Sequence, residues 1–225
     1  MEVERVKQEF KTVDLFAGPG GLAEGFSAFR DARGQKVFDI AFSVEKEASA
    51  FATLRLRSFF RQFAKAPDAY YDYIAGRISK ESLVSAYPEE WQRAELETAM
   101  LELGTDEARE EVDKRLEDII ALAGSNTVVI GGPPCQAYSL VGRARNQGIK
   151  GYVASEDDRH FLYREYIRIL ERLRPAAFVM ENVKGILSSK IGGEHIIDQV
   201  LADLRAAGGT DDSYRLVPIV DDDRG

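Results

Sequence analysis

Near its N-terminus the chain reads Thr12-Val13-Asp14-Leu15-Phe16-Ala17-Gly18-Pro19-Gly20-Gly21, an apolar run that passes directly into a glycine-rich turn. The apolar run predicts a strand, and the glycines predict a tight turn. Leu22, Phe26 and Phe29 then recur at helical spacing. A strand, a turn and a helix in this order predict the first unit of a parallel α/β sheet.

The same alternation continues along the chain. The pattern predicts strands over 38–44, 127–130, 177–180 and 214–220, and helices from 48, over 161–173 and over 196–204. We therefore expect one domain over 1–225 with an α/β fold, a doubly wound and mostly parallel sheet. Residues 55–125 interrupt the alternation and are rich in Glu, Arg, Lys, Ala and Leu. We expect them to form a helical insertion.

Composition limits the classes of protein that the chain can belong to. It has 225 residues, 44% of them apolar, which suffices for a core, and no run approaches the roughly 18 apolar residues of a membrane span. Its N-terminus lacks the apolar centre of a signal peptide. One cysteine and two histidines exclude an intrachain disulfide and disfavour a zinc site. We expect a cytoplasmic protein that needs neither a membrane nor a metal.

The charge is concentrated unevenly. A formal net charge of −8 argues against a protein that coats nucleic acid non-specifically. A basic and glycine-containing segment nevertheless follows the single cysteine, with Arg143, Arg145, Lys150, Arg159 and Arg164. This segment is suited to contact an anion, and a solvated surface loop is the alternative interpretation.

The first glycine turn predicts a cofactor site. Glycines allow a ligand to approach the backbone closely, and the amides at the start of the next helix attract negative charge. Glu45, at the end of the second predicted strand, is placed to accept hydrogen bonds from ribose hydroxyls. Gly18, Gly20 and Ala23 also satisfy the loose dinucleotide pattern, so an NAD-dependent oxidoreductase competes at this point. A purely structural turn is a further alternative.

Two other strand ends carry chemistry. Gly131-Gly132-Pro133-Pro134-Cys135-Gln136 follows one predicted strand, and its two prolines stiffen the turn that bears the only cysteine. Glu181-Asn182-Val183 follows another. Carboxyl ends of parallel strands share one edge of a sheet, so we expect the thiol and the carboxyl group to face one pocket. Taken singly, Cys135 also fits a small buried side chain, and Glu181 a surface carboxylate or helix cap.

Together these segments resemble a known family. Asp14-Leu15-Phe16-Ala17-Gly18-Pro19-Gly20-Gly21, Gly132-Pro133-Pro134-Cys135-Gln136-Ala137-Tyr138-Ser139 and Glu181-Asn182-Val183 resemble the cofactor, nucleophile and acid motifs of C5-cytosine DNA methyltransferases, in the family's order. The resemblance covers about 13–220, apart from 55–125. It implies the Rossmann-like fold of class I S-adenosylmethionine-dependent methyltransferases, and methylation of cytosine C5 in flipped-out bases of double-stranded DNA.

The resemblance also implies residue roles. Cys135 would add to C6 of the cytosine, and Glu181, held protonated by burial, would hydrogen-bond N3. Substrate contacts are implied for Gln136, Ser139, Arg143 and Asn182. Cofactor contacts are implied for Phe16, Gly18, Gly20, Gly21, Leu22, Glu45 and Pro134. The family has an Asp near the adenine after the third strand; Asp113 and Asp118 are both candidates here, and neither is assigned.

The sequence departs from the family's pattern in two places. The first is the 55–125 insertion, and the second is the end of the chain, where no Gln-x-Arg-x-Arg motif or target-recognition region is visible. We therefore expect the N-terminal catalytic portion of a longer bacterial or phage modification methylase, poorly active by itself, with its recognition region or a cognate restriction enzyme as partners. Alternatives are a tRNA cytosine-5 methyltransferase, an NAD-binding oxidoreductase and a non-catalytic cofactor-binding module.

Overall fold

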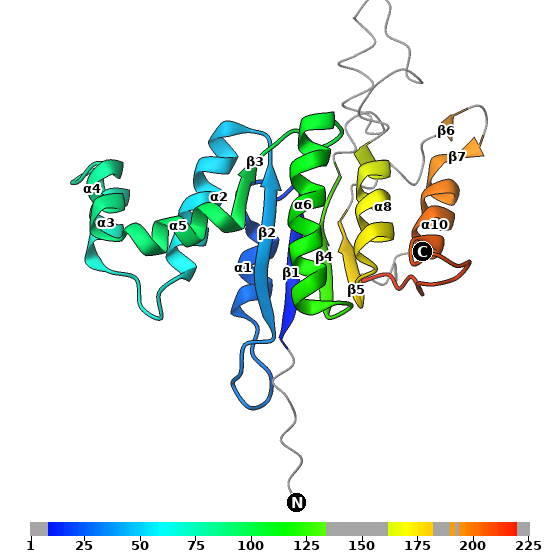
Figure 1. Ribbon diagram of the computed structural model, residues 1–225, viewed down its shortest axis with the longest axis horizontal. Coiled ribbons are helices and arrows are strands. Elements are labelled where there is room, and N and C mark those ends of the chain that lie inside the picture. The colour runs from blue at the N-terminus through cyan, green and yellow to red at the C-terminus, as the bar shows by residue number, and fades with distance from the viewer. Residues whose placement is uncertain (1–8, 134–161, 182–189, 192–193, 220–225) are drawn as a thin grey trace, which may run out of the picture. The chain divides into compact units, whose positions relative to one another are not determined.

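A computed structural model describes residues 9–133, 162–181, 190–191 and 194–219 (Figure 1). The chain forms two compact units, one of residues 1–132 with 176–181 and one of 133–175 with 182–225. The first unit contains a five-stranded sheet in the order β3-β2-β1-β4-β5, in which every pair of neighbours is parallel. Its strands are β1 (Phe10–Leu15), β2 (Phe38–Glu45), β3 (Thr98–Met100), β4 (Thr127–Gly131) and β5 (Ala177–Met180).

Helices cover both faces of this sheet. Those of the first unit are α1 (Gly21–Ala28), α2 (Ala48–Arg61), α3 (Asp68–Ile74), α4 (Lys80–Ala86), α5 (Pro88–Glu97) and α6 (Asp106–Ala123). In Figure 1, α6 lies in front of the strands, and α1 and α2 lie behind them. Right-handed crossovers from β1 to β2 and β2 to β3 run opposite in direction along the sheet to the crossover from β3 to β4, so the helices separate in this way. The predicted doubly wound α/β fold is confirmed.

The two faces of the sheet differ in chemistry. The face towards α6 is apolar: Val13 and Phe42 pair across β1 and β2 and are fully buried, and the Arg115 guanidinium of α6 lies 5.7 Å from the Phe42 ring centroid. On the opposite face the strand register aligns Asp14 with Ser43, and Ser43 with Thr98. All three of these polar residues are buried. A buried polar row therefore crosses β1, β2 and β3 beneath α1 and α2.

The interval predicted as an insertion contains elements of two kinds. Residues 55–61 continue α2, whereas β3 and α6 belong to the regular alternation of the sheet. The additional helices are α3, α4 and α5, which extend beyond the β3 edge (Figure 1). They have a small core of their own with α2, formed by the buried residues Phe59, Leu83, Trp91 and Ala94.

The second unit is described in three pieces: α8 (Leu162–Leu173), the short hairpin of β6 (Lys190–Ile191) and β7 (Glu194–His195), and α10 (Ile196–Ala206). The helices predicted over 161–173 and 196–204 are confirmed within the described residues. The strand predicted over 214–220 is wrong for its described part, because 214–219 pairs with no strand. Val217 and Ile219 are exposed there, and Tyr214 instead donates to the carbonyl of Pro175 at 2.8 Å.

Candidate active site

The turn after β1 has a backbone that requires glycine. Gly18 and Gly20 have φ angles of 55° and 86°, in the left-handed region, and Gly20 is the N-cap of α1. Phe16 also has a positive φ of 57°, which is unusual for a bulky residue and concentrates at ligand sites. The Gly20 amide donates to the Ala17 carbonyl at 2.9 Å, which closes the turn. The predicted strand, turn and helix therefore form as one tight unit.

This turn has one open and one closed side. A Cβ atom added at Gly18 or Gly21 would meet no heavy atom within 4 Å, whereas one at Gly20 would lie 2.8 Å from Leu54 Cδ1 of α2. The first amides of α1, from Gly21 and Leu22, have no acceptor within the helix by its geometry. The open side therefore offers backbone donors and space, which fits a ligand that carries acceptor groups.

Glu45 ends β2 beside this turn. Its Oε2 accepts a hydrogen bond from the Gly18 amide at 2.7 Å, and its Oε1 accepts one from the Glu47 amide at 2.7 Å. Each carboxylate oxygen has two acceptor positions, so two further bonds remain available to a vicinal diol. The side chain is half-buried, and the backbone amides of Gly18 and Glu47 fix the direction of its carboxylate. The remaining acceptor positions of the Glu45 carboxylate fit the two hydroxyl groups of a ribose.

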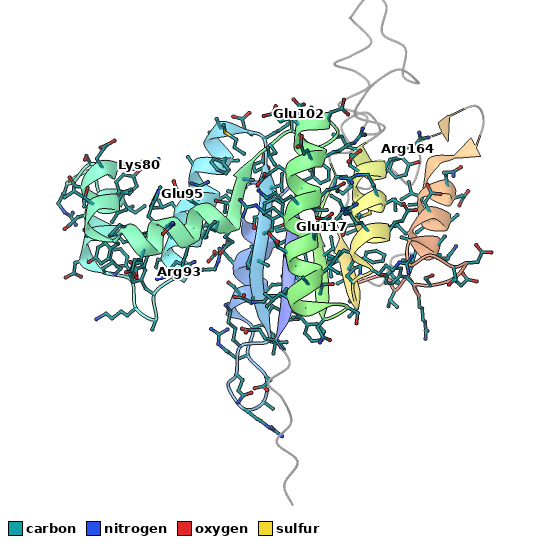
Figure 2. The ribbon with its side chains drawn as sticks, in the orientation of Figure 1. Lys80, Arg93, Glu95, Glu102, Glu117 and Arg164 are labelled. Carbon is teal, nitrogen blue, oxygen red and sulfur yellow. The ribbon has the colours of Figure 1, made fainter. Side chains whose placement is uncertain are left out.

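The residues at the end of β3 are not the two Asp residues that the sequence offered as candidates for the adenine side of the site. Asp113 and Asp118 lie in α6, about 10 and 18 Å along that helix from its start, and the helix runs away from this edge of the sheet. The acidic residue next to the end of β3 is Glu102, labelled in Figure 2, whose Oε1 lies 2.9 Å from Lys46 Nζ. Met100, the last residue of β3, is 55% exposed. Met100 and Glu102 are the functional candidates that the sequence pattern missed.

Asp14 is a buried carboxyl group directly behind the turn. It is fully buried, and burial raises its pKa from 3.8 to about 7, against the lowering effect of Arg61. The Ala23 amide of α1 acts on it as a weak donor, and neither carboxyl oxygen reaches full hydrogen-bond geometry with any described residue. Asp14 therefore titrates near neutral pH and faces the helix that the turn begins.

Glu181 lies at the same edge of the sheet, after β5. Its amide donates to the Gly131 carbonyl of β4 at 3.1 Å. A Cβ on Gly132 would lie 2.6 Å from Glu181 Cδ, so the carboxyl group rests against a position that only glycine leaves open. The side chain is exposed, so the burial that was expected to hold Glu181 protonated is not found. The structure thus places the predicted acid beside the segment that leads to the cysteine.

The remaining predicted residues lie outside the described part of the chain. They are Pro134, Cys135, Gln136, Ser139, Arg143 and Asn182. The predicted residues that are described lie at the carboxyl ends of β1, β2 and β5: Phe16, Gly18, Gly20, Gly21, Leu22, Glu45 and Glu181. Within the described ranges, no group of three or more His, Cys, Asp or Glu side chains is arranged to hold a metal ion. No helix in those ranges is long and apolar enough to cross a membrane.

Comparison with known proteins identifies the family. A family model described as C-5 cytosine-specific DNA methylase matches residues 91–217. The Type II methyltransferase M.Bpa9945I of Bacillus paralicheniformis is 35% identical over 200 residues, which are 80% of this chain and 42% of that protein. The Type II methyltransferase M.AgeI of Thalassovita gelatinovora is 31% identical over 190 residues, 84% of this chain and 31% of that protein.

A third relative has a larger share of its length covered. The Type II methyltransferase M.AquIA of Picosynechococcus is 29% identical over 202 residues, which are 89% of this chain and 60% of that protein. The matched part of the chain thus spans between about a third and three fifths of the length of these three relatives. The matched residues 91–217 include the segments around Cys135 and Glu181, and the alignment with the first relative covers 80% of the chain. This chain belongs to the C-5 cytosine-specific DNA methylase family.

Proposed function

We propose that the chain carries the cofactor-binding and nucleophile-bearing part of a methyltransferase that transfers a methyl group from S-adenosylmethionine to C5 of cytosine in DNA. The observation that carries this proposal is the arrangement at one edge of a parallel sheet. The glycine turn after β1, Glu45 at the end of β2 and Glu181 against Gly132 all lie at the carboxyl ends of its strands, where ligands bind in open α/β sheets.

The described residues fit this cofactor. Gly18 and Gly21 leave open space at the turn, and Glu45 keeps acceptor capacity for the two ribose hydroxyls. Phe16 and Leu22 flank the turn and are half-buried, so they can cover an apolar part of the ligand. Met100 and Glu102 stand at the neighbouring strand end, and we assign the adenine side of the site to them. When bound, S-adenosylmethionine supplies an electrophilic methyl group on a sulfonium sulfur.

Cys135 supplies the nucleophile in this proposal. Its thiolate adds to C6 of the cytosine, which makes C5 electron-rich enough to take the methyl group; loss of the C5 proton to a base and departure of the thiolate then restore the aromatic ring. Cys135 follows Gly132 by three residues, and three residues span at most about 11 Å. The proposal therefore requires the thiol and the Glu181 carboxyl group to meet on the same base, and the short link to Gly132 is compatible with this.

Glu181 supplies the acid. A protonated carboxyl group that hydrogen-bonds N3 offsets the negative charge which develops on the ring when the thiolate adds. Glu181 is exposed in this structure, so its carboxyl group is accessible to an incoming base. C6 is inaccessible within a duplex, so the cytosine must leave the base stack, at a cost of a few kcal/mol.

The proposal is tested by methyl transfer. The chain is incubated with S-adenosylmethionine carrying a labelled methyl group and with double-stranded DNA, and the nucleosides are then analysed by mass spectrometry. The proposal predicts label in 5-methylcytosine and its loss in Cys135→Ala. Label in N4-methylcytosine or N6-methyladenine would contradict it. A tRNA acceptor in parallel tests the alternative substrate. If this chain alone shows no turnover, the assay is repeated with the protein expressed from the gene together with its downstream sequence, and that result decides the question.

A further inference from the structure

One face of α2 lies along the glycine turn and α1. Leu54, Arg57 and Arg61 are three and four residues apart, so they share this face. Leu54 fills the space that a Cβ on Gly20 would need, and Arg57 Nη1 donates to the Pro19 carbonyl at 2.9 Å. Arg61 Nη1 pairs with Glu24 of α1. The closed side of the turn is therefore formed by α2.

The neighbouring face of α2 is held by α5 and β3. Arg55 Nη2 donates to the Thr98 carbonyl at 3.0 Å, and Arg55 Nη1 lies 3.2 Å from Glu95 Oε1. Glu95 and Arg93 are labelled on α5 in Figure 2, and Arg93 Nε donates to Gln62 at 3.1 Å just beyond the end of α2. The additional helices thus fix the position of α2, which in turn backs the glycine turn.

Arg61 takes part in both sets of contacts. While Nη1 pairs with Glu24 of α1, Nη2 pairs with Glu97, the last residue of α5. The Arg61 and Glu97 side chains are only 10% and 9% exposed. A buried guanidinium is stable only when its charge and donors are matched, so this geometry is specific rather than a loose surface contact.

From these contacts we infer that Arg61 is a positioning residue for the cofactor-binding turn, and that α5 acts on the cofactor site through it. The inference rests on the proposed binding of S-adenosylmethionine at this turn. A glycine turn is intrinsically mobile, because glycine loses more conformational freedom on ordering than other residues. When the turn is already held in its binding conformation, ligand binding does not have to include the free-energy cost of ordering it, and the affinity is higher.

The expected effect follows from the fraction of molecules whose turn is ready to bind. If loss of the two-sided bridge lowers that fraction to about one tenth, the apparent Kd rises about tenfold. Arg61→Lys is the informative variant: it keeps the charge, but an ammonium group cannot make the planar two-sided contact to Glu24 and Glu97. The double variant Arg61→Met with Glu97→Gln removes the contacts of Arg61 with Glu24 and Glu97. It also removes both charges of the buried Arg61–Glu97 pair, so neither is left without its partner.

The experiment measures the Kd of S-adenosylhomocysteine by calorimetry, and hydrogen exchange of amides 17–22 without ligand, on the full chain. Arg77→Lys is the matched control, because Asp72 of α3, at 2.7 Å, is the one ion-pair partner of Arg77 among the described residues and the Arg77 side chain is 63% exposed. The inference predicts about tenfold weaker binding and faster exchange at 17–22 for both Arg61 variants, and no change for the control. Folding is checked by circular dichroism.

Two results would overturn the inference: wild-type Kd and exchange in folded Arg61→Lys, or equal loss of affinity in Arg77→Lys. If Arg61→Lys does not fold, the same criteria apply to Arg61→Met with Glu97→Gln. Failure of the wild-type chain to bind S-adenosylhomocysteine would contradict the proposed function instead. The exchange comparison would then still decide whether Arg61 positions the turn.

Discussion

Glu45 Oε2 lies 2.7 Å from the amide nitrogen of Gly18, which links the ends of β2 and β1 through one hydrogen bond. The same carboxylate accepts from the Glu47 amide, so its direction is fixed before any ligand arrives. This bond makes Glu45 both a support of the glycine turn and a group that can take ribose hydroxyls. The proposed cofactor site is therefore assembled from two strand ends rather than from a single loop.

Removal of this carboxylate should weaken cofactor binding. Glu45→Ala leaves the Gly18 amide without its acceptor and removes the acceptors for the ribose; a hydrogen bond to a charged group contributes about 1.5–3 kcal/mol, so we expect about 10- to 100-fold higher Kd for S-adenosylmethionine. Calorimetry measures this. Glu47→Ala, at the start of α2, is the control and should leave the Kd within about twofold.

Two glycines of one segment should respond oppositely to alanine. Gly20→Ala places a Cβ 2.8 Å from Leu54 Cδ1 at a φ of 86°, and the left-handed backbone alone costs about 1–2 kcal/mol. Gly25 lies within α1, and a Cβ there meets nothing within 4 Å. Gly25→Ala should stabilise the protein by about 0.5–1 kcal/mol. Urea unfolding distinguishes them, and equal effects would contradict the described turn.

Asp14 predicts a pH dependence of stability. Its pKa is about 7 in the folded protein and near 3.8 when unfolded, so between these values the folded state binds the extra proton. The free energy of unfolding should then fall as the pH rises from 5 to 7, by up to roughly 1.4 kcal/mol per pH unit for one proton. Glu97, whose pKa is also raised by burial, acts in the same direction.

Asp14→Asn tests this dependence. In the variant, the free energy of unfolding should fall less steeply between pH 5 and 7. At pH 8, where Asp14 of the wild type is ionised, the variant should be more stable than the wild type. Burial raises the pKa of Asp39, but hydrogen bonds from Lys11 and Lys36 outweigh it and lower that pKa overall. Asp39→Asn therefore changes stability by a constant amount over this range. An unchanged slope in Asp14→Asn would show that other groups around Arg61 take up the proton.

Sequence reasoning predicted the strands and helices that have strong local patterns. It identified β2, β4 and β5 closely, because their apolar β-branched runs are bounded by glycine or charge. It missed β3, which is three residues long and follows Glu95-Leu96-Glu97, a run that favours helix. Pairing with β2 decides the strand conformation there, and that tertiary contact is invisible in the local sequence.

The candidate site was predictable only where the residues of a sequence motif themselves form the turn or its hydrogen bonds. Gly18, Gly20 and Glu45 lie where the pattern places them. Met100 and Glu102 were missed because the position of β3 was unknown, which also left Asp113 and Asp118 as candidates. The roles of Asp14 and Arg61 depend on residues 36 to 47 positions apart meeting beneath the sheet, and no local periodicity reports such a contact.

Glu181 should govern covalent addition rather than cofactor affinity. Glu181→Gln keeps the size of the side chain but cannot supply a proton to N3, so addition of the thiol to cytosine should slow by about 10²-fold or more. Rapid quench of adduct formation on DNA containing 5-fluorocytosine measures this rate. Glu171→Gln on α8 is the control. A loss confined to the Kd of the cofactor would contradict the assignment of Glu181 as the acid.

The covalent adduct tests the central claim most directly. The full chain is mixed with S-adenosylmethionine and a duplex in which 5-fluorocytosine replaces the target cytosine, and its intact mass is measured under denaturing conditions. Fluorine takes the place of the C5 hydrogen and cannot leave as a cation, so the thiolate cannot be eliminated after methyl transfer. The account therefore predicts a stable mass equal to protein, DNA strand and one methyl group, absent in Cys135→Ser. A wild-type chain that transfers methyl groups to cytosine without forming this adduct, or an equal adduct in Cys135→Ser, would contradict it.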